Sequence, residues 1–136
     1  LRDDFPYMFS FGEGDGDPYA WIRELGAYSP IVHMQQTDGV RSSHAPFTAE
    51  TNRTGIIAPG KVLRAMKESF DREEEEGMPP KTDRVTLAFE LFISNVSYPH
   101  DYLEDLKETV AHWKRYIPED GMTLDEAVEW LERIEK

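Results

Sequence analysis

The sequence predicts an α/β fold in which parallel strands are covered by helices. Two short runs, residues 31–36 and 85–93, alternate in the manner of strands, and a helical pattern that begins at Pro59 lies between them. One further helical pattern precedes the first strand and two follow the second. Strands that alternate with helices are typical of β/α units that share a parallel sheet. A chain of 136 residues is long enough for one domain with a hydrophobic core.

The segment before the first strand predicts an apolar run, a turn and a helix. Residues 5–11 are apolar and aromatic and fit either a strand or a packed loop, and the GEGDGD that follows is a turn. In the next segment, DPYAWIREL, Asp17 suits the N-cap and Pro18 suits the first helical position. Gly26 suits the end of this helix.

A long polar loop joins the first strand to the central helix. Residues 36–58 carry little helical or strand pattern, and loops of that length in compact domains are often functional. We interpret Asn52 and Gly55 within it as turn residues. The helix from Pro59 presents one apolar face, formed by Val62, Leu63, Met66 and Phe70. The charged segment DREEEEGMPPKTD that follows is interpreted as a solvated helix end and a loop.

Two helices are predicted after the second strand. The first spans residues 100–117 and ends before Pro118. Its predicted apolar stripe consists of Leu103, Leu106, Val110, Trp113 and Ile117. The second begins with TLDE at residues 123–126, which has the pattern of a capping box. Its predicted inward positions are Leu124, Ala127, Val128, Leu131 and Ile134.

The overall composition excludes several classes of partner and site. The net charge of −12 argues against nucleic acid or an anionic membrane as the main partner, because both would be repelled. A phosphate on a small substrate stays possible, since a local arginine outweighs the global field. The absence of cysteine excludes disulfides and thiolate metal sites. No apolar run approaches the length of a membrane span and no signal peptide is visible, so we expect a cytoplasmic protein.

Strand alternation singles out one histidine and one glutamate. Val85, Leu87, Phe89, Leu91 and Ile93 share one face of the second strand, whereas Glu90 lies on the other. A carboxylate within a strand is costly to bury unless it is paired or bound to a metal. His33 occupies the corresponding face of the first strand. If both faces line one cavity, an imidazole and a carboxylate converge as half of a divalent-metal site. The alternatives are a structural histidine and a glutamate that is open to water or paired with a lysine or arginine.

The loop after the first strand is rich in groups that bind substrates. Arg41 is a planar donor suited to a phosphate or carboxylate. Hydroxyl groups are supplied by Ser42, Ser43 and Thr48. His44 fits three roles: a general acid or base, a second metal ligand, or a hydrogen-bonding partner of a sugar. Each of these residues taken alone is typical of an exposed loop, and only their clustering after His33 points to a site.

Several segments together resemble a known enzyme family. DPYAWIRELGAYSPIVHMQQTDG, SSHAPFT, GIIAPGKVLRAM and LAFEL are similar to the C-terminal part of sugar phosphate isomerases and epimerases with the xylose-isomerase-like TIM barrel. Within that family the likeness is greatest to the tetrulose-phosphate isomerases of erythritol catabolism. It covers roughly residues 15–117. DPYAW together with HMQQTDG is fairly specific, whereas LAFEL alone is weak.

The resemblance implies roles for individual residues. His33 matches the metal-binding histidine of the family, Gln36 matches a following acid or amide ligand, and Gln35 is an alternative contact to metal or substrate. Glu90 matches the glutamate that binds the metal and moves a proton. His44 lies near a second loop histidine of the related endonuclease branch, although Ser42 stands where that branch has an aspartate. The two other carboxylate ligands of the family come from earlier strands, and no Asp-x-Gly-His motif occurs in residues 1–16.

The resemblance also implies a fold and an activity. A complete (β/α)₈ barrel takes about 250 residues. Residues 1–136 are therefore expected to form the last two or three β/α units of a TIM barrel plus an extra C-terminal helix, as part of a longer protein or a truncated copy. The implied activity is isomerisation or epimerisation of a small ketose or ketose phosphate through an enediol, with Mn²⁺, Mg²⁺, Zn²⁺ or Co²⁺ as cofactor.

Two other functions stay open at this stage. One is a metal-dependent hydrolase of the same fold, similar to endonuclease IV, which the acidic composition disfavours. The other is a non-catalytic remnant, because part of the ligand set is missing. The expected partner is a small sugar or sugar phosphate. Open strand edges also predict association into a homo-oligomer or with another chain.

Overall fold

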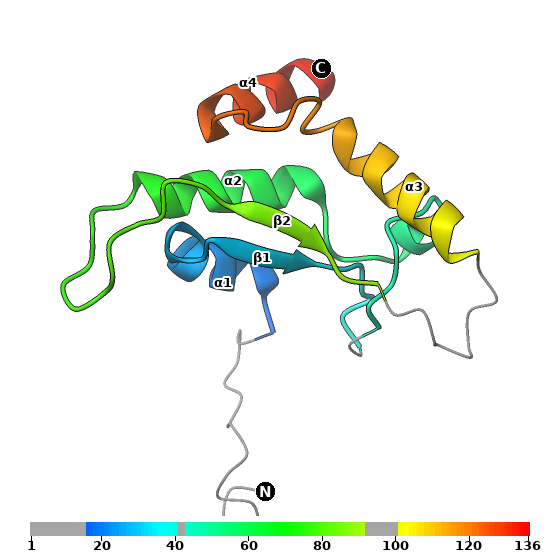
Figure 1. Ribbon diagram of the computed structural model, residues 1–136, viewed down its shortest axis with the longest axis horizontal. Helices are drawn as coiled ribbons and strands as arrows, with labels where there is room; N and C mark the ends of the chain where they lie inside the picture. Colours follow the sequence, from blue (N-terminus) through cyan, green and yellow to red (C-terminus); the bar gives the residue numbers. More distant parts are fainter. Residues whose placement is uncertain (1–15, 41–42, 92–100) are drawn as a thin grey trace, which may run out of the picture.

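A computed structural model describes residues 16–40, 43–91 and 101–136 (Figure 1). The predicted run at residues 5–11 lies outside these ranges, as do residues 92 and 93 at the end of the second predicted strand. The elements, in chain order, are α1 (Pro18–Leu25), η1 (Gly26–Tyr28), β1 (Ile31–Met34), η2 (Thr51–Arg53), α2 (Pro59–Asp71), β2 (Thr86–Phe89), α3 (Tyr102–Lys114) and α4 (Leu124–Ile134). Every helix predicted within the described ranges is present.

The two strands pair in parallel, with helix α2 in the connection between them. Ile31 is the register partner of Thr86, and Met34 is the partner of Phe89. The α/β class with a parallel sheet is therefore confirmed. Two strands make up the sheet in the part of the chain that the structure describes. The complete TIM barrel and the association through open strand edges stay predictions.

One face of the sheet is covered and the other is open. Val32 and Met34 of β1 and Leu87 and Phe89 of β2 point to the covered face, which confirms the predicted alternation. The core beneath them is built from Met34, Phe47, Val62 and Trp113, with Tyr19, Ile22, Val32, Ile57, Leu87, Phe89 and Ile117 packed around it. Helices α1, α2 and α3 all contribute to this one core. The side chain of Ile31, on the opposite face of β1, is 58% exposed.

Helix α1 begins at the predicted residues and ends at Gly26 as predicted, but this C-cap has an ordinary helical backbone conformation. The carboxylate of Asp17 accepts a hydrogen bond from the amide of Tyr19 at 2.9 Å, and Pro18 occupies the first turn. Gly26 does not adopt the left-handed conformation of a typical C-cap, because its φ is −58° and the chain continues into η1. The glycine is needed for space instead. A Cβ there would lie 2.8 Å from the sulfur of Met66 on α2.

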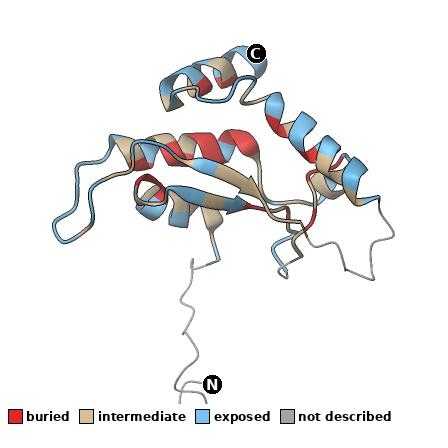
Figure 2. Cartoon of the chain, in the orientation of Figure 1, coloured by how far each residue is buried: buried red, intermediate tan, exposed pale blue. Residues whose placement is uncertain are grey.

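Helix α2 forms the centre of the helical layer, and Figure 2 shows buried residues gathered along it. Val62, Leu63 and Met66 are buried as predicted. The segment from residue 72 to residue 84 contains no helix or strand and is largely exposed, which confirms its interpretation as a solvated loop. None of the described helices is long and apolar enough to cross a membrane.

Helix α3 confirms the inward positions of Trp113 and Ile117 but is rotated relative to the rest of its predicted stripe. Leu103 and Val110, which were expected to face inward, are 64% and 39% exposed. The buried positions are Thr109 and Trp113. The reason lies in the long loop, because the buried amide of Phe47 donates to the hydroxyl of Thr109 at 2.9 Å. A buried amide needs such an acceptor, so this hydrogen bond stabilises the orientation in which Thr109 faces inward.

Helix α4 packs on α2 and confirms most of its prediction. Thr123 and Glu126 form the predicted capping box. Ala127 and Leu131 are buried, whereas Ile134, in the last turn, is 43% exposed. Ion pairs join the two helices, one of them between Arg64 and Glu135 at 2.6 Å.

Candidate functional site

His33 and Glu90 lie side by side at the carboxyl ends of the two strands. His33 is the register partner of Ala88, and Glu90 follows the last residue of β2. The amide of Glu90 donates to the carbonyl of Met34 at 3.0 Å, which extends the parallel ladder by one step. Both side chains leave the open face of the sheet, with Nδ1 of His33 3.2 Å from Oε2 of Glu90. The predicted convergence of an imidazole and a carboxylate from neighbouring parallel strands is confirmed.

A second imidazole reaches the same carboxylate from the long loop. Nδ1 of His44 lies 3.6 Å from Oε2 of Glu90. The His44 side chain is only 17% exposed, compared with 62% for His33 and 40% for Glu90. Its backbone φ is 45°, a left-handed conformation that few residues other than glycine adopt. The loop therefore carries His44 into the site in an unusual and specific backbone conformation.

The main chain of the loop explains how His44 arrives there. Gln36 and Ala45 form an isolated antiparallel bridge, with hydrogen bonds of 2.8 and 3.1 Å between their amides and carbonyls. The hydroxyl of Ser43 donates to the carbonyl of Gln36 at 3.1 Å. The residues on both sides of His44 are thus attached to the end of β1.

Gln36 has a structural role rather than the predicted role of metal ligand. Its side chain is buried, with 2% of the residue exposed. Nε2 donates to Oδ1 of Asn52 and to the carbonyl of Ile57, at 2.8 and 3.0 Å. Oε1 accepts from the amides of Ile57 and Thr37, at 2.9 and 3.1 Å. These four bonds use the hydrogen-bonding capacity of the amide, so coordination of a metal would break existing bonds.

The other predicted contacts occupy different surroundings. Oε1 of Gln35 is buried and has no hydrogen-bond partner among the described residues. Thr48 is 8% exposed. Its hydroxyl accepts a hydrogen bond from the amide of Thr51 at the start of η2, so its role is structural. The hydroxyl of Ser43 donates to the carbonyl of Gln36, so its role is structural as well. Arg41 and Ser42 lie outside the described residues.

The site contains structural residues whose roles the sequence pattern did not reveal. A Cβ at Gly55 would lie 2.2 Å from Cδ of Gln36, so the buried amide fits only beside a glycine. Nδ2 of Asn52 lies 3.4 Å from Nδ1 of His112 on α3. The His112 ring stacks on Phe47, with centroids 6.1 Å apart. Burial, followed by the charge of Arg115, lowers the pKa of His112, which favours the neutral ring.

The donor atoms fit a divalent cation in kind but form a partial set. Ligand atoms bound tetrahedrally at about 2.1 Å from one ion lie about 3.4 Å apart. The distances of 3.2 and 3.6 Å from the two imidazoles to Oε2 of Glu90 are close to that spacing. Across the described residues, however, no group of three or more histidine, aspartate or glutamate side chains is placed so that it could hold a metal ion. His33, His44 and Glu90 therefore do not form a metal site by themselves, and a cation bound here would need ligands from outside the described residues.

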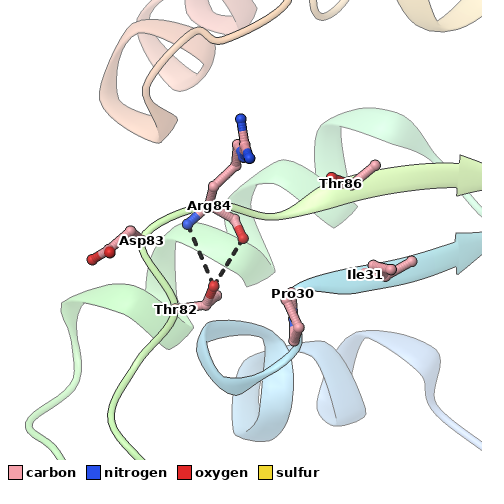
Figure 3. A pocket seen from close by; sticks show the side chains of 6 residues that line it. All are labelled: Pro30, Ile31, Thr82, Asp83, Arg84 and Thr86. Atoms are coloured by element: carbon pink, nitrogen blue, oxygen red, sulfur yellow. Dashed lines mark hydrogen bonds between the residues drawn. The ribbon is translucent and has the colours of Figure 1, made fainter.

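A shallow hollow lies at the opposite ends of the strands (Figure 3). It is lined by Pro30, Ile31, Thr82, Asp83, Arg84 and Thr86. The hydroxyl of Thr82 and the main chain of Arg84 hydrogen-bond to each other there. Ligands of parallel α/β sheets bind at the carboxyl ends of the strands, where His33 and Glu90 lie. The hollow at the amino ends is therefore not the candidate site.

Comparison with known proteins places the chain near one enzyme. It is 32% identical over 104 residues, or 76% of its length, to D-erythrulose 1-phosphate 3-epimerase of Brucella abortus (strain 2308). The aligned region is 30% of the length of that relative, so the chain spans less than a third of it. No family model matches the sequence. The relative agrees with the resemblance to sugar phosphate isomerases and epimerases that the motifs indicated.

Proposed function

This chain is related by sequence to the tetrulose-phosphate epimerases and isomerases, and from that premise we propose that it forms part of the active site of a sugar phosphate epimerase or isomerase. The proposed substrate is a small ketose phosphate, and D-erythrulose 1-phosphate, named for the relative, is the first compound to test. The proposed reaction is a proton transfer next to the ketose carbonyl that depends on a divalent metal.

The single observation that supports this proposal is the contact between His33 and Glu90. Nδ1 of His33 lies 3.2 Å from Oε2 of Glu90 on the open face of a parallel sheet. A carboxylate with an imidazole beside it suits both proton transfer and cation binding. His44 adds a second nitrogen at 3.6 Å, from a loop that lies close to the carboxyl ends of the strands.

The proposed roles divide between these three side chains. His33, His44 and Glu90 would hold the metal, which would be Mn²⁺, Mg²⁺, Zn²⁺ or Co²⁺, together with ligands from outside this set. When bound, the metal polarises the ketose carbonyl and lowers the pKa of the neighbouring C–H. Glu90 would take that proton from carbon, which leaves an enediolate. Return of a proton to the opposite face of the same carbon would complete epimerisation. Isomerisation would instead return the proton to the adjacent carbon and move a second proton from one oxygen to the other.

Two further residues are proposed to bind the substrate. Oε1 of Gln35 is a buried acceptor without a hydrogen-bond partner in the described ranges, and a sugar hydroxyl would satisfy it. Arg41, whose position is not described, is proposed from the sequence alone to bind the phosphate. Gln36, Ser43 and Thr48 are left out of this set because their polar atoms already bond within the loop.

Deuterium exchange tests the proposed reaction directly. We propose to incubate the protein with D-erythrulose 1-phosphate and Mn²⁺ in D₂O, and to follow the proton beside the carbonyl by NMR. The expected result is deuterium incorporation that Glu90→Gln abolishes. Glu74→Gln, which changes the same charge in the exposed loop after α2, is expected to keep full exchange. Exchange that is absent in the wild-type protein, or equally fast in Glu90→Gln, would contradict the proposal.

A further inference from the structure

The backbone of His44 needs external support to stay in place. A left-handed φ of 45° in a residue with a side chain is tolerated only where surrounding contacts hold it. Those contacts come from Gln36, whose main chain binds Ala45 on one side of His44 and Ser43 on the other. The position of the imidazole beside Glu90 therefore depends on the position of Gln36.

The side chain of Gln36 links the end of β1 to two other parts of the loop. Its amide bonds both main-chain groups of Ile57, next to the start of α2. It also donates to Oδ1 of Asn52 at 2.8 Å. Gly55 leaves the room that the amide needs, since any Cβ there would overlap it. The buried side-chain amide of Gln36 thus joins the beginning of the loop to Asn52 and Ile57 near its end.

Asn52 carries this link on to helix α3. The backbone amide of Asn52 donates to the carbonyl of Thr48 at 3.0 Å, which fixes the turn. Its side-chain Nδ2 lies 3.4 Å from Nδ1 of His112, a nitrogen that accepts a hydrogen bond in the neutral tautomer with its proton on Nε2. Asn52 is the residue of the loop that contacts both the Gln36 amide and a ring seated against the core.

We infer that Gln36 and Asn52 are positioning residues, which hold His44 against Glu90 through a chain of hydrogen bonds that ends on α3. Neither residue touches the carboxylate of Glu90 in the contacts described above. The geometric part of this inference stands on those contacts alone. Its consequence for proton transfer rests on the proposed function.

Metal-free NMR tests the geometric part. We propose to measure nuclear Overhauser effects from the ring protons of His44 and of His33 to the side-chain protons of Glu90. Asn52→Ala is expected to weaken the His44 signal at least fivefold and to leave the His33 signal unchanged. Asn52→Asp, which keeps an oxygen for Nε2 of Gln36, is expected to restore the His44 signal. Arg53→Ala removes an exposed side chain from the same turn and serves as the matched control.

Each outcome of this experiment decides the inference. A folded Asn52→Ala protein with an unchanged His44 signal overturns it, as does equal loss of the His33 and His44 signals. If Asn52→Ala does not fold, Asn52→Asp and Gln36→Glu provide the comparison. Asn52→Asp must keep the His44 signal. Gln36→Glu must lose it, because the substitution places a carboxylate oxygen next to Oδ1 of Asn52 in place of the donor Nε2.

A kinetic measurement connects the inference to the proposed reaction. In an active enzyme, Asn52→Ala is expected to lower kcat about tenfold or more, with KM little changed, because a small misplacement of a catalytic group is costly. Asn52→Asp is expected to recover most of kcat. Should the enzyme lack epimerase and isomerase activity, the NMR comparison still stands by itself, so failure of the proposed function and failure of this inference are distinguishable.

Discussion

Nδ1 of His33 and Oε2 of Glu90 lie 3.2 Å apart, although the two residues belong to different strands and are separated in the sequence by helix α2. The parallel register brings them together, because Glu90 continues the ladder one residue beyond the pair formed by Met34 and Phe89. Both face the side of the sheet that the helices leave open. This contact therefore follows from the pairing of β1 and β2.

The fit of Gln36 beside Gly55 predicts a steep cost for one added methyl group. Gly55→Ala would place a Cβ 2.2 Å from Cδ of Gln36. We expect a loss of about 1–3 kcal/mol in the free energy of unfolding, because the buried amide has no alternative set of partners. Gly16→Ala is the matched control, since a Cβ there meets nothing within 4 Å. Urea unfolding of both variants checks this, and equal stability would contradict it.

The hydrogen bond between Phe47 and Thr109 predicts that the hydroxyl of residue 109 contributes more to stability than the volume of its side chain. Thr109→Val keeps the shape but leaves the buried amide of Phe47 without its acceptor. The expected cost is about 1–3 kcal/mol. Thr109→Ser keeps the oxygen and should lose less, mainly through its missing methyl group. Thermal unfolding of the two proteins gives the order, and a more stable valine variant would refute the assignment.

The rotation of α3 exposes Leu103, so truncation of this leucine should cost far less stability than truncation of a buried leucine on α4. Leu131 on α4 is fully buried, whereas Leu103 on α3 is 64% exposed. Leu131→Ala is expected to cost about 2–5 kcal/mol, because it leaves a cavity against α2. Leu103→Ala is expected to change stability by no more than about 0.5 kcal/mol. Denaturant titration of both variants tests this rotation. A large loss at Leu103 would instead support the inward stripe that the periodicity indicated.

The buried ring of His112 predicts a pH dependence of stability. Burial and the charge of Arg115 lower its pKa in the folded state from the usual 6.5. Below pH 6.5 the unfolded chain therefore binds more protons, and stability falls as pH falls until the folded ring is also protonated. The wild-type protein should lose more stability between pH 7.5 and pH 5 than His112→Gln does. Because carboxylates titrate in both proteins, the difference isolates His112, and identical losses would disprove this.

The sequence was sufficient to predict features that depend on periodicity and local chemistry. Alternation along two strands predicted that His33 and Glu90 share a face, and the capping patterns predicted the starts of α1 and α4. These features were predictable because each depends on neighbouring residues or on a repeat of fixed length. Contact between the two strands followed from the rule that β/α units build parallel sheets.

The remaining features depend on contacts between distant residues. A glutamine that binds a metal and a glutamine that closes a loop look identical in sequence, so the role of Gln36 appeared only with Asn52 and Ile57 around it. The rotation of α3 likewise appeared only with the contact between the amide of Phe47 and the hydroxyl of Thr109. Gly55 was interpreted as a turn residue, whereas its importance lies in the space that it leaves for an amide nineteen positions earlier.

Titration with Mn²⁺ tests the central claim, that His33 and Glu90 converge to bind a cation, most directly. Paramagnetic broadening of histidine ring signals by NMR reports which imidazoles approach the ion. We predict that the ring signals of His33 and His44 broaden saturably and much more strongly than those of His112. This broadening should be lost in Glu90→Gln and retained in the equally charged Glu74→Gln. Broadening that does not saturate, or that is the same in Glu90→Gln and Glu74→Gln, would contradict the claim.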